Sequence, residues 1–264
     1  MSKNGPLALC FNALVIGFML APLVVVCLVA FTPENTLSIP TTDFSLRWFK
    51  AVFAHPDFMT SFWNSVWLAL AAASVSTCVA IPAGLAITRY QFAGRDALNA
   101  LFLSPLIVPH LVLGVAILRL FSLIGATGSF FWLVLAHVVV VTPYVLRLVL
   151  AASAGMDRSC EQAALSLGAS QSAVFRRVTL PMILPGVTGG WLLAFINSFD
   201  EVTMSIFVTS PATVTLPVRM YMYATESIDP LMAAVSALMV ALTGGVMILL
   251  DRLYGLDKIL VGSK

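Results

Sequence analysis

Two adjacent carboxylates, Asp200 and Glu201, lie in an otherwise apolar stretch that reads FINSFDEVTMSIF. Ionisable side chains at membrane depth are costly, and they usually face the interior of a helical bundle or an aqueous cavity. Successive residues of an α-helix diverge by about 100° around its axis, so one carboxylate can face a pathway while the other needs a different partner. With the amide of Asn197, these acids predict a cation-attracting site on a translocation route. The alternative is that the helix ends near Ser198 and that water surrounds both acids.

A second unusual stretch, residues 157–185, is the most polar segment between two strongly apolar regions, and it reads DRSCEQAALSLGASQSAVFRRVTLPMILP. Residues 161–167 are predicted to be helical, and Gly168 can take the left-handed conformation needed to turn between two helices. Ala163 and Ala164 place small side chains on a helix outside the bilayer. Exposed apolar surface rimmed by charge is typical of a partner-binding site. We therefore predict that a partner docks here.

Motifs that would mark an enzyme do not occur in the sequence. It contains no GxxxxGK[ST] loop to cradle a nucleotide phosphate, no HExxH and no GxSxG. His110 and His137 lie far apart in apolar stretches, which favours hydrogen-bonded side chains between helices over proton carriers. The four cysteines form no CxxC pair, which disfavours a zinc site or a disulfide framework. We therefore predict no catalytic residue, no metal site and no cofactor in this chain.

The composition is that of a membrane protein. Of the 264 residues, 60% are hydrophobic and only 10% are charged, whereas soluble domains are about 45–50% apolar and about 25% charged. A membrane-spanning helix needs about 20 largely apolar residues. Six stretches meet this need approximately: residues 7–31, 61–88, 97–121, 129–151, 182–208 and 230–252. We predict an all-α integral membrane fold of six transmembrane helices in a single domain over residues 1–264.

Lysine and arginine side chains are distributed unevenly around these six stretches. In short loops they accumulate on the cytoplasmic side of a membrane. One side of the six-span arrangement carries Lys3, Arg89, Arg95, Arg147, Arg158, Arg176, Arg177, Arg252, Lys258 and Lys264; the other carries Arg47, Lys50, Arg119 and Arg219. This bias predicts that both termini and the loop of residues 153–181 are cytoplasmic. The net charge of +2 gives no indication of a nucleic-acid partner.

The polar stretch also carries a family resemblance. EQAALSLGASQSAVFRRVTLP resembles the cytoplasmic EAA loop of the permeases of bacterial ABC importers, in which a Glu-Ala-Ala triplet precedes a glycine and a later Leu-Pro. The residues that match this pattern by spacing are Ala163, Ala164, Gly168, Leu180 and Pro181. The sequence departs at the first position of the triplet, where Gln162 stands in place of glutamate and Glu161 comes one residue earlier.

The resemblance extends from WNSVWLAL to SFDEVTMSIFVTSP, and the latter is similar to the smaller permease subunit of spermidine/putrescine importers. It implies a type I ABC importer in the bacterial inner membrane. Its partners would be the lipid bilayer, a second permease subunit in a heterodimer, two ABC ATPase subunits that bind ATP and Mg²⁺, and a periplasmic solute-binding protein. The residues that the resemblance assigns to ATPase coupling are Glu161, Gln162, Ala163, Ala164, Gly168, Ala169 and Pro181.

We therefore interpret the chain as a permease subunit, not an enzyme, that translocates a small organic cation of the putrescine or spermidine type. Another cargo, such as gamma-aminobutyrate, another amino-acid derivative or an aminophosphonate, remains an alternative for the same class. A stand-alone secondary transporter would favour inverted repeats with broken helices in matching halves. Prolines interrupt several apolar stretches here, but the two halves do not match. An intramembrane enzyme is disfavoured because no nucleophile–base pair occurs at a recognisable spacing.

Overall fold

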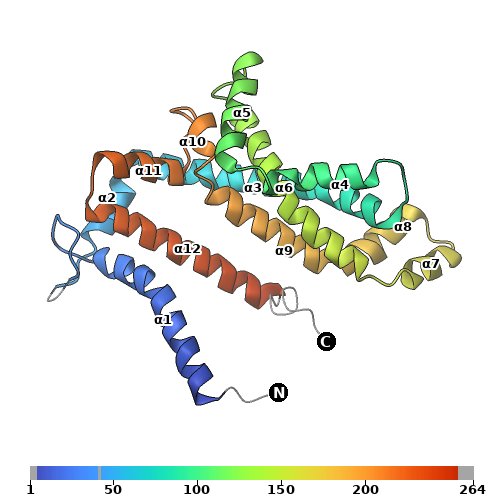
Figure 1. Ribbon diagram of the computed structural model, residues 1–264, viewed down its shortest axis with the longest axis horizontal. Helices are drawn as coiled ribbons and strands as arrows, with labels where there is room; N and C mark the ends of the chain where they lie inside the picture. Colours follow the sequence, from blue (N-terminus) through green and yellow to red (C-terminus); the bar gives the residue numbers. More distant parts are fainter. Residues whose placement is uncertain (1–4, 41–42, 255–264) are drawn as a thin grey trace. The chain divides into compact units, whose positions relative to one another are not determined.

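The computed structural model describes residues 5–40 and 43–254, which form helices joined by turns (Figure 1). No strand occurs in these two ranges, and the all-α membrane fold predicted from the sequence is confirmed. Lys3, Lys258 and Lys264, and with them the predicted location of the two termini, lie outside the described residues.

The helical elements follow one another in a chain of twelve α-helices, one 3₁₀ turn (η1) and one stretch of π-helix (η2) within the described residues. In order they are α1 (Pro6–Val29), α2 (Arg47–Ala54), α3 (Pro56–Arg89), α4 (Arg95–Leu103), η1 (Ser104–Leu106), α5 (His110–Leu123), α6 (Phe130–Ala154), α7 (Ser159–Ser166), α8 (Gln171–Val174), η2 (Phe175–Thr179), α9 (Leu180–Phe199), α10 (Ser205–Val208), α11 (Leu216–Glu226) and α12 (Pro230–Tyr254).

Four of the described helices are long and apolar enough to cross a membrane. Three are α1, α3 and α6, which coincide closely with the first, second and fourth predicted spans. The fourth is the continuous helix Gln171–Phe199, which α8, η2 and α9 form together. α12 begins at Pro230, as the sixth predicted span does, and its apolar part Pro230–Val246 is shorter. The count of six spans therefore remains a prediction.

The third predicted span, residues 97–121, is bent rather than continuous. Arg95–Leu106 and His110–Leu123 meet at 104°. Proline accounts for the break, because Pro109 has no N–H to donate and its ring disfavours a helical conformation at the preceding residue. Pro109 has an extended ψ of 130°, and α5 begins at the next residue. The segment is therefore a broken span or a re-entrant loop.

The fifth predicted span, residues 182–208, ends earlier than expected. α9 stops at Phe199, residues 200–204 form a turn, and α10 begins at Ser205. The first amides of a helix have no partner within that helix. Here a carboxylate oxygen of Glu201 accepts a hydrogen bond from the Met204 N–H at 2.7 Å. An acidic side chain of the turn thus provides the acceptor for the amide directly before α10.

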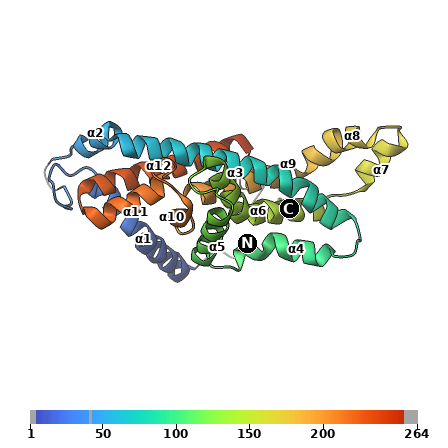
Figure 2. The same cartoon turned by 90° about the horizontal axis from the view of Figure 1, so that it is seen from above.

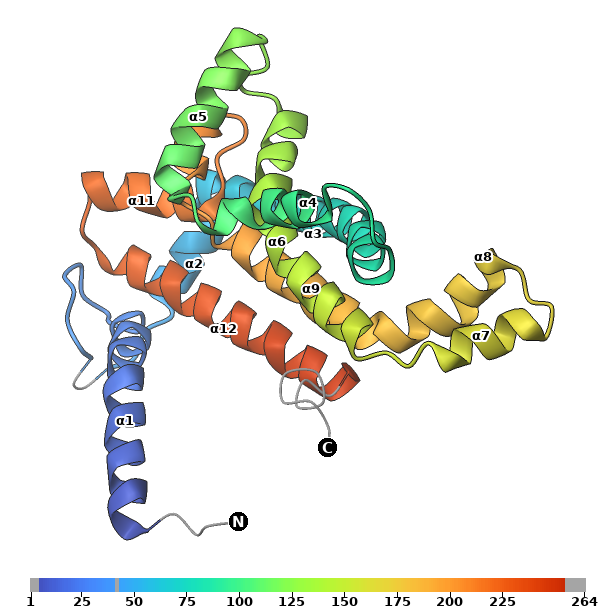
Figure 3. The ribbon, with the colours of Figure 1, turned by 45° about the vertical axis from the view of Figure 1, so that its right-hand side comes forward.

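α6 and α9 run side by side (Figure 3) and pack closely against each other. Gly186 and Gly190 are four residues apart on α9 and therefore share one face. A Cβ atom on Gly186 would lie 2.7 Å from the carbonyl oxygen of Leu148, and one on Gly190 would lie 3.0 Å from the Cα of Val145. Small residues at this spacing let membrane helices approach to backbone contact.

The chain divides into two compact units, and how they are placed relative to each other is not determined. The first comprises Met1–Thr60 with Arg219–Ile248, and the second comprises Ser61–Val218 with Leu249–Lys264. In the first unit the Tyr223 hydroxyl donates to a carboxylate oxygen of Asp229 at 2.7 Å. Burial of the phenol and, to a smaller extent, this hydrogen bond raise the pKa of Tyr223 to about 12. The candidate sites described below all lie in the second unit.

Candidate coupling and pathway sites

The polar stretch predicted as a docking site forms two short helices, α7 and α8, which lie together at one end of the second unit (Figure 2). Gly168 joins them with a φ of +85°. The Ala169 N–H donates to the Ala164 carbonyl at 3.1 Å and the Gly168 N–H donates to the Leu165 carbonyl at 2.9 Å, which is the Schellman pattern of a glycine-terminated helix. The predicted left-handed turn at Gly168 is confirmed.

The outer surface of α7 combines small and apolar side chains. Gln162 and Ala163 are exposed, and the Leu167 side chain is 88% exposed at the tip of the turn. Ala164 and Ala169 are partly buried against the loop. The docking role assigned to these residues stays a prediction.

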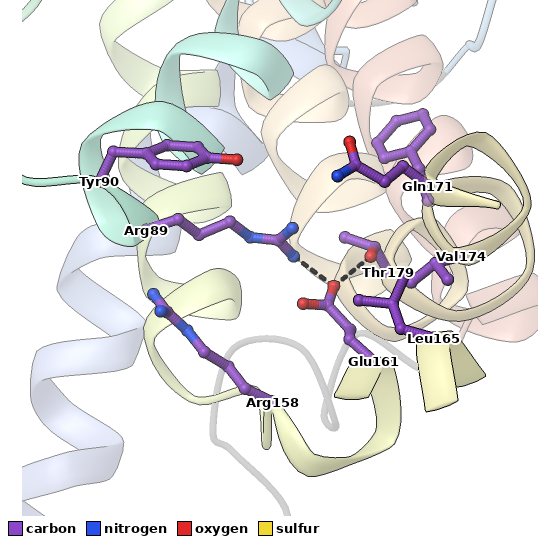
Figure 4. A pocket seen from close by; sticks show the side chains of 9 residues that line it. Arg89, Tyr90, Arg158, Glu161, Leu165, Gln171, Val174 and Thr179 are labelled. Carbon is purple, nitrogen blue, oxygen red and sulfur yellow. Dashed lines mark hydrogen bonds and ion pairs between the residues drawn. The ribbon is translucent and has the colours of Figure 1, made fainter. Parts of the chain in front are cut away.

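Glu161 faces the opposite way, into the protein. One of its carboxylate oxygens, Oε1, accepts hydrogen bonds from Arg89 Nη2 at 2.5 Å and from the Thr179 hydroxyl (Figure 4). The ion pair is mostly shielded, since the side chains of Arg89 and Glu161 are 20% and 12% exposed. Glu161 and Gln162, which sequence analysis grouped together, therefore differ: one is an internal ion-pair partner and the other lies on the surface.

A cavity of about 350 Å³ lies beside this ion pair. Arg158 approaches it from the start of α7 and donates from Nη2 to the Thr88 carbonyl at 2.8 Å. The Ser159 N–H donates to Asp157 and lowers the pKa of that carboxyl group. The polar residues that line the cavity are Arg89, Tyr90, Arg158, Glu161, Gln171 and Thr179.

The π-helical stretch η2 interrupts the helix that leaves this loop. Pro181 follows it and cannot donate to the carbonyl four residues earlier, with which its ring also clashes. A wider π turn just before the proline relieves that clash, and π turns inside α-helices are frequent at functional sites. Pro181, predicted from the family pattern as a coupling residue, thus lies within two residues of Thr179, which contacts Glu161.

The two pathway candidates are in different environments. Asp200 is exposed at the end of α9. Glu201 is only 7% exposed, and its Oε2 pairs with His110 Nδ1 at 2.7 Å. The predicted difference between the acids is therefore observed, but its cause is the end of the helix at Phe199 and not rotation around a continuous helix. Asn197 donates from Nδ2 to the Leu193 carbonyl of its own helix at 2.8 Å.

His137 fastens both sides of this turn to α6. Its ring is fully buried, with Nδ1 2.9 Å from the Ser198 hydroxyl and Nε2 2.9 Å from the Ser205 hydroxyl. Ser198 belongs to α9 and Ser205 begins α10, so one imidazole spans the break between them. The prediction of a hydrogen-bonded histidine between helices is confirmed for His137, whereas His110 pairs with Glu201 in the turn after α9.

Two features of this unit were not predicted from the sequence. Arg89 was counted only as a cytoplasmic charge, because its partner Glu161 lies 72 residues away and no local pattern links them. The close contact of α6 with α9 could have been found, since Gly186 and Gly190 form a GxxxG pattern in an apolar helix. Among the residues that the structure describes, no group of three or more His, Cys, Asp or Glu could hold a metal ion.

Comparison with known proteins gives matches over most of the chain. The sequence is 29% identical over 239 residues to the spermidine/putrescine transport system permease protein PotC of Haemophilus influenzae, covering 90% of this chain and 93% of that one. It is 29% identical over 234 residues to the putrescine transport system permease protein PotI of Escherichia coli, covering 86% and 83%. A solved bacterial ABC transporter involved in the import of alginate matches with a TM-score of 0.72 and 14% identity, covering 96% of this chain and 98% of that chain.

Long apolar helices, a match to a family of transport-system membrane components and permease relatives matched over most of their length define the class: the chain is the membrane-embedded permease subunit of an ABC importer and is not itself an enzyme. It belongs to the family described as binding-protein-dependent transport system inner membrane component, whose model matches residues 77–256. This membership confirms the resemblance seen in the EAA-like loop. It also decides against a stand-alone secondary transporter.

Proposed function

We propose that this permease translocates a small organic cation of the polyamine type, putrescine or spermidine, across the bacterial inner membrane. The names of the relatives, which are spermidine/putrescine and putrescine permeases, support this cargo. The structural observation that carries the proposal is the exposed carboxylate of Asp200 at the end of α9. A cation that leaves water needs such acidic partners along its route.

The two acids have separate roles in this proposal. Asp200 offers its charge to the cargo, whereas the Glu201 carboxylate is occupied by His110 and by the Met204 N–H. Glu201 therefore holds the turn that presents Asp200. Asn197 lies on the last turns of the same helix, and its side-chain oxygen adds an acceptor next to the route.

The permease works in a larger complex, in which it pairs with a second permease subunit as a heterodimer. Two ABC ATPase subunits bind ATP and Mg²⁺ on the cytoplasmic side, and a periplasmic solute-binding protein delivers the cargo. Both termini are cytoplasmic. The ATPase docks on α7 and its turn, through Gln162, Ala163, Ala164, Gly168 and Ala169, and Leu167 at the tip of the turn adds apolar surface.

The experiment is uptake into proteoliposomes that contain the permease with its ATPase, its partner permease and its binding protein. ATP inside the vesicles should drive uptake of radiolabelled putrescine or spermidine, with no uptake when ATP is omitted. ATP-driven uptake of gamma-aminobutyrate or of an aminophosphonate, without uptake of either polyamine, would assign the permease to the alternative cargo.

Variants of the two acids test the pathway separately from the cargo. Asp200→Asn should reduce putrescine uptake about tenfold or more, because a hydrogen bond to a charged group contributes about 1.5–3 kcal/mol. Glu201→Gln is the matched control; it should reduce the thermal stability of the complex and affect uptake less. Unchanged uptake by Asp200→Asn would remove this carboxylate from the route.

A further inference from the structure

A single carboxylate oxygen joins the predicted coupling helix to two membrane helices. Glu161 lies in the first turn of α7, Arg89 is the last residue of α3, and Thr179 is the last residue of η2, directly before α9. Oε1 of Glu161 accepts from both Arg89 Nη2 and the Thr179 hydroxyl (Figure 4). A displacement of the start of α7 therefore acts on the ends of α3 and α9 at the same time.

A second set of contacts fixes the same end of α7. Arg158 donates to the Thr88 carbonyl, and the Thr88 hydroxyl lies 2.8 Å from the hydroxyl of Ser153 at the end of α6. The opposite end of α7 has no such ties in the described structure, and Leu167 there is 88% exposed. The helix is thus held at its start and open to a partner at its tip.

We propose that Glu161 is a positioning residue inside the permease that transmits the movement of α7 to α3 and α9, and so links ATP hydrolysis to cargo movement. It is 12% exposed and acts without touching the ATPase, whereas its neighbour Gln162 lies on the outer surface. This inference rests on the proposed docking of an ATPase on α7.

The charge of the pair makes the connection specific. Arg89 Nε is buried and has no hydrogen-bond partner in the described structure. The guanidinium of Arg89 therefore depends on the Glu161 carboxylate for its hydrogen bond. Removing one partner of a shielded ion pair leaves the other charge uncompensated. The π-helical stretch η2, which follows α8 and ends at Thr179, gives the helix a place where its hydrogen-bond register can shift, and π turns inside α-helices are frequent at functional sites. Two discrete arrangements of these contacts would provide the bistable element that coupling requires.

The test compares ATP hydrolysis with cargo uptake in the reconstituted complex, with ATP and radiolabelled putrescine as probes. Glu161→Gln removes the charge and keeps the shape. The amount of ATP hydrolysed per putrescine molecule imported should rise about tenfold, within the range of coupling factors between protein sites, while ATPase and permease still copurify. A purely structural role would lower hydrolysis and uptake together and leave their ratio unchanged.

Asp96→Asn is the matched control, because Asp96 is an exposed carboxylate in the first turn of α4. It should keep the wild-type ratio of hydrolysis to uptake. The double variant Glu161→Arg with Arg89→Glu exchanges the two charges. Its ratio of ATP hydrolysed to putrescine imported should lie closer to the wild-type ratio than that of Glu161→Gln. If Glu161→Gln does not assemble, Thr179→Val keeps the ion pair, removes one of the two hydrogen bonds and should give a smaller rise in the same ratio.

The outcomes separate the inference from the proposed function. A wild-type complex that imports no polyamine contradicts the proposed cargo, and the ratio is then measured with the cargo that it does import. A complex that imports its cargo with a wild-type ratio in the Glu161→Gln variant, or in Thr179→Val if that variant replaces it, overturns the role of Glu161.

Discussion

Replacing Gly186 by alanine would place a methyl group where α6 and α9 are in backbone contact. The added Cβ would lie 2.6 Å from the Cβ of Ala152 and 2.7 Å from the Leu148 carbonyl oxygen, whereas ordinary contacts begin at 3.4 Å. Neither the carbonyl oxygen nor the Cβ of Ala152 can rotate away, so the two helices must separate by up to 0.8 Å, the difference between 3.4 and 2.6 Å. Overpacking of this kind costs about 1–3 kcal/mol.

The measurement is thermal unfolding of the purified complex, compared with the variant Gly17→Ala. Gly17 lies in α1, and a Cβ there meets nothing within 4 Å. Alanine at an unconstrained helical position is favourable by about 0.5–1 kcal/mol, so Gly17→Ala should be neutral or stabilising. The midpoint for Gly186→Ala should fall clearly below both the wild type and this control. Equal midpoints for the two variants would refute the close approach of α6 and α9.

Two further substitutions test the turn after α7 and the turn between α9 and α10. Gly168→Ala places a Cβ on a residue with a φ of +85°, which costs about 1 kcal/mol. The strain is conformational, because that Cβ meets no neighbouring atom. Asparagine tolerates this conformation better than alanine, so the Gly168→Asn variant should retain more uptake than Gly168→Ala, and equal uptake by the two variants would contradict this. His137→Leu removes the ring that hydrogen-bonds to the hydroxyls of Ser198 and Ser205. It should destabilise the complex by about 1 kcal/mol, the range found for hydrogen bonds between membrane helices. Unchanged thermal stability would contradict the role of His137 in holding the two sides of the turn.

The parts of the fold that depend on local pattern could be predicted from the sequence. Apolar runs of about 20 residues gave α1, α3 and α6 because each must bury its length in lipid. The glycine turn after α7 followed from the one residue type that enters the left-handed region without strain. The bend before His110 was not predicted, although the sequence signal was present in Pro109 and its effect on the preceding residue.

The contacts between distant residues could not be predicted in the same way. The ion pair of Arg89 with Glu161 forms because α7 folds back against the end of α3. The two residues are 72 positions apart, and no local sequence pattern indicates that they meet. The end of α9 at Phe199 depends on Glu201 finding His110 and the Met204 N–H, which are tertiary and turn contacts. The two acids therefore differ because α9 ends directly before them, and that Asp200 faces the cargo stays a prediction.

The central claim is that ATP drives an organic cation through this permease past Asp200. Its most direct test is the initial rate of radiolabelled putrescine uptake by proteoliposomes that contain the full complex, with wild-type permease or with Asp200→Asn. The proposed function predicts ATP-dependent uptake by the wild type and a loss of about tenfold or more in the variant. Equal uptake by both proteins, or polyamine uptake that persists without ATP, would contradict it.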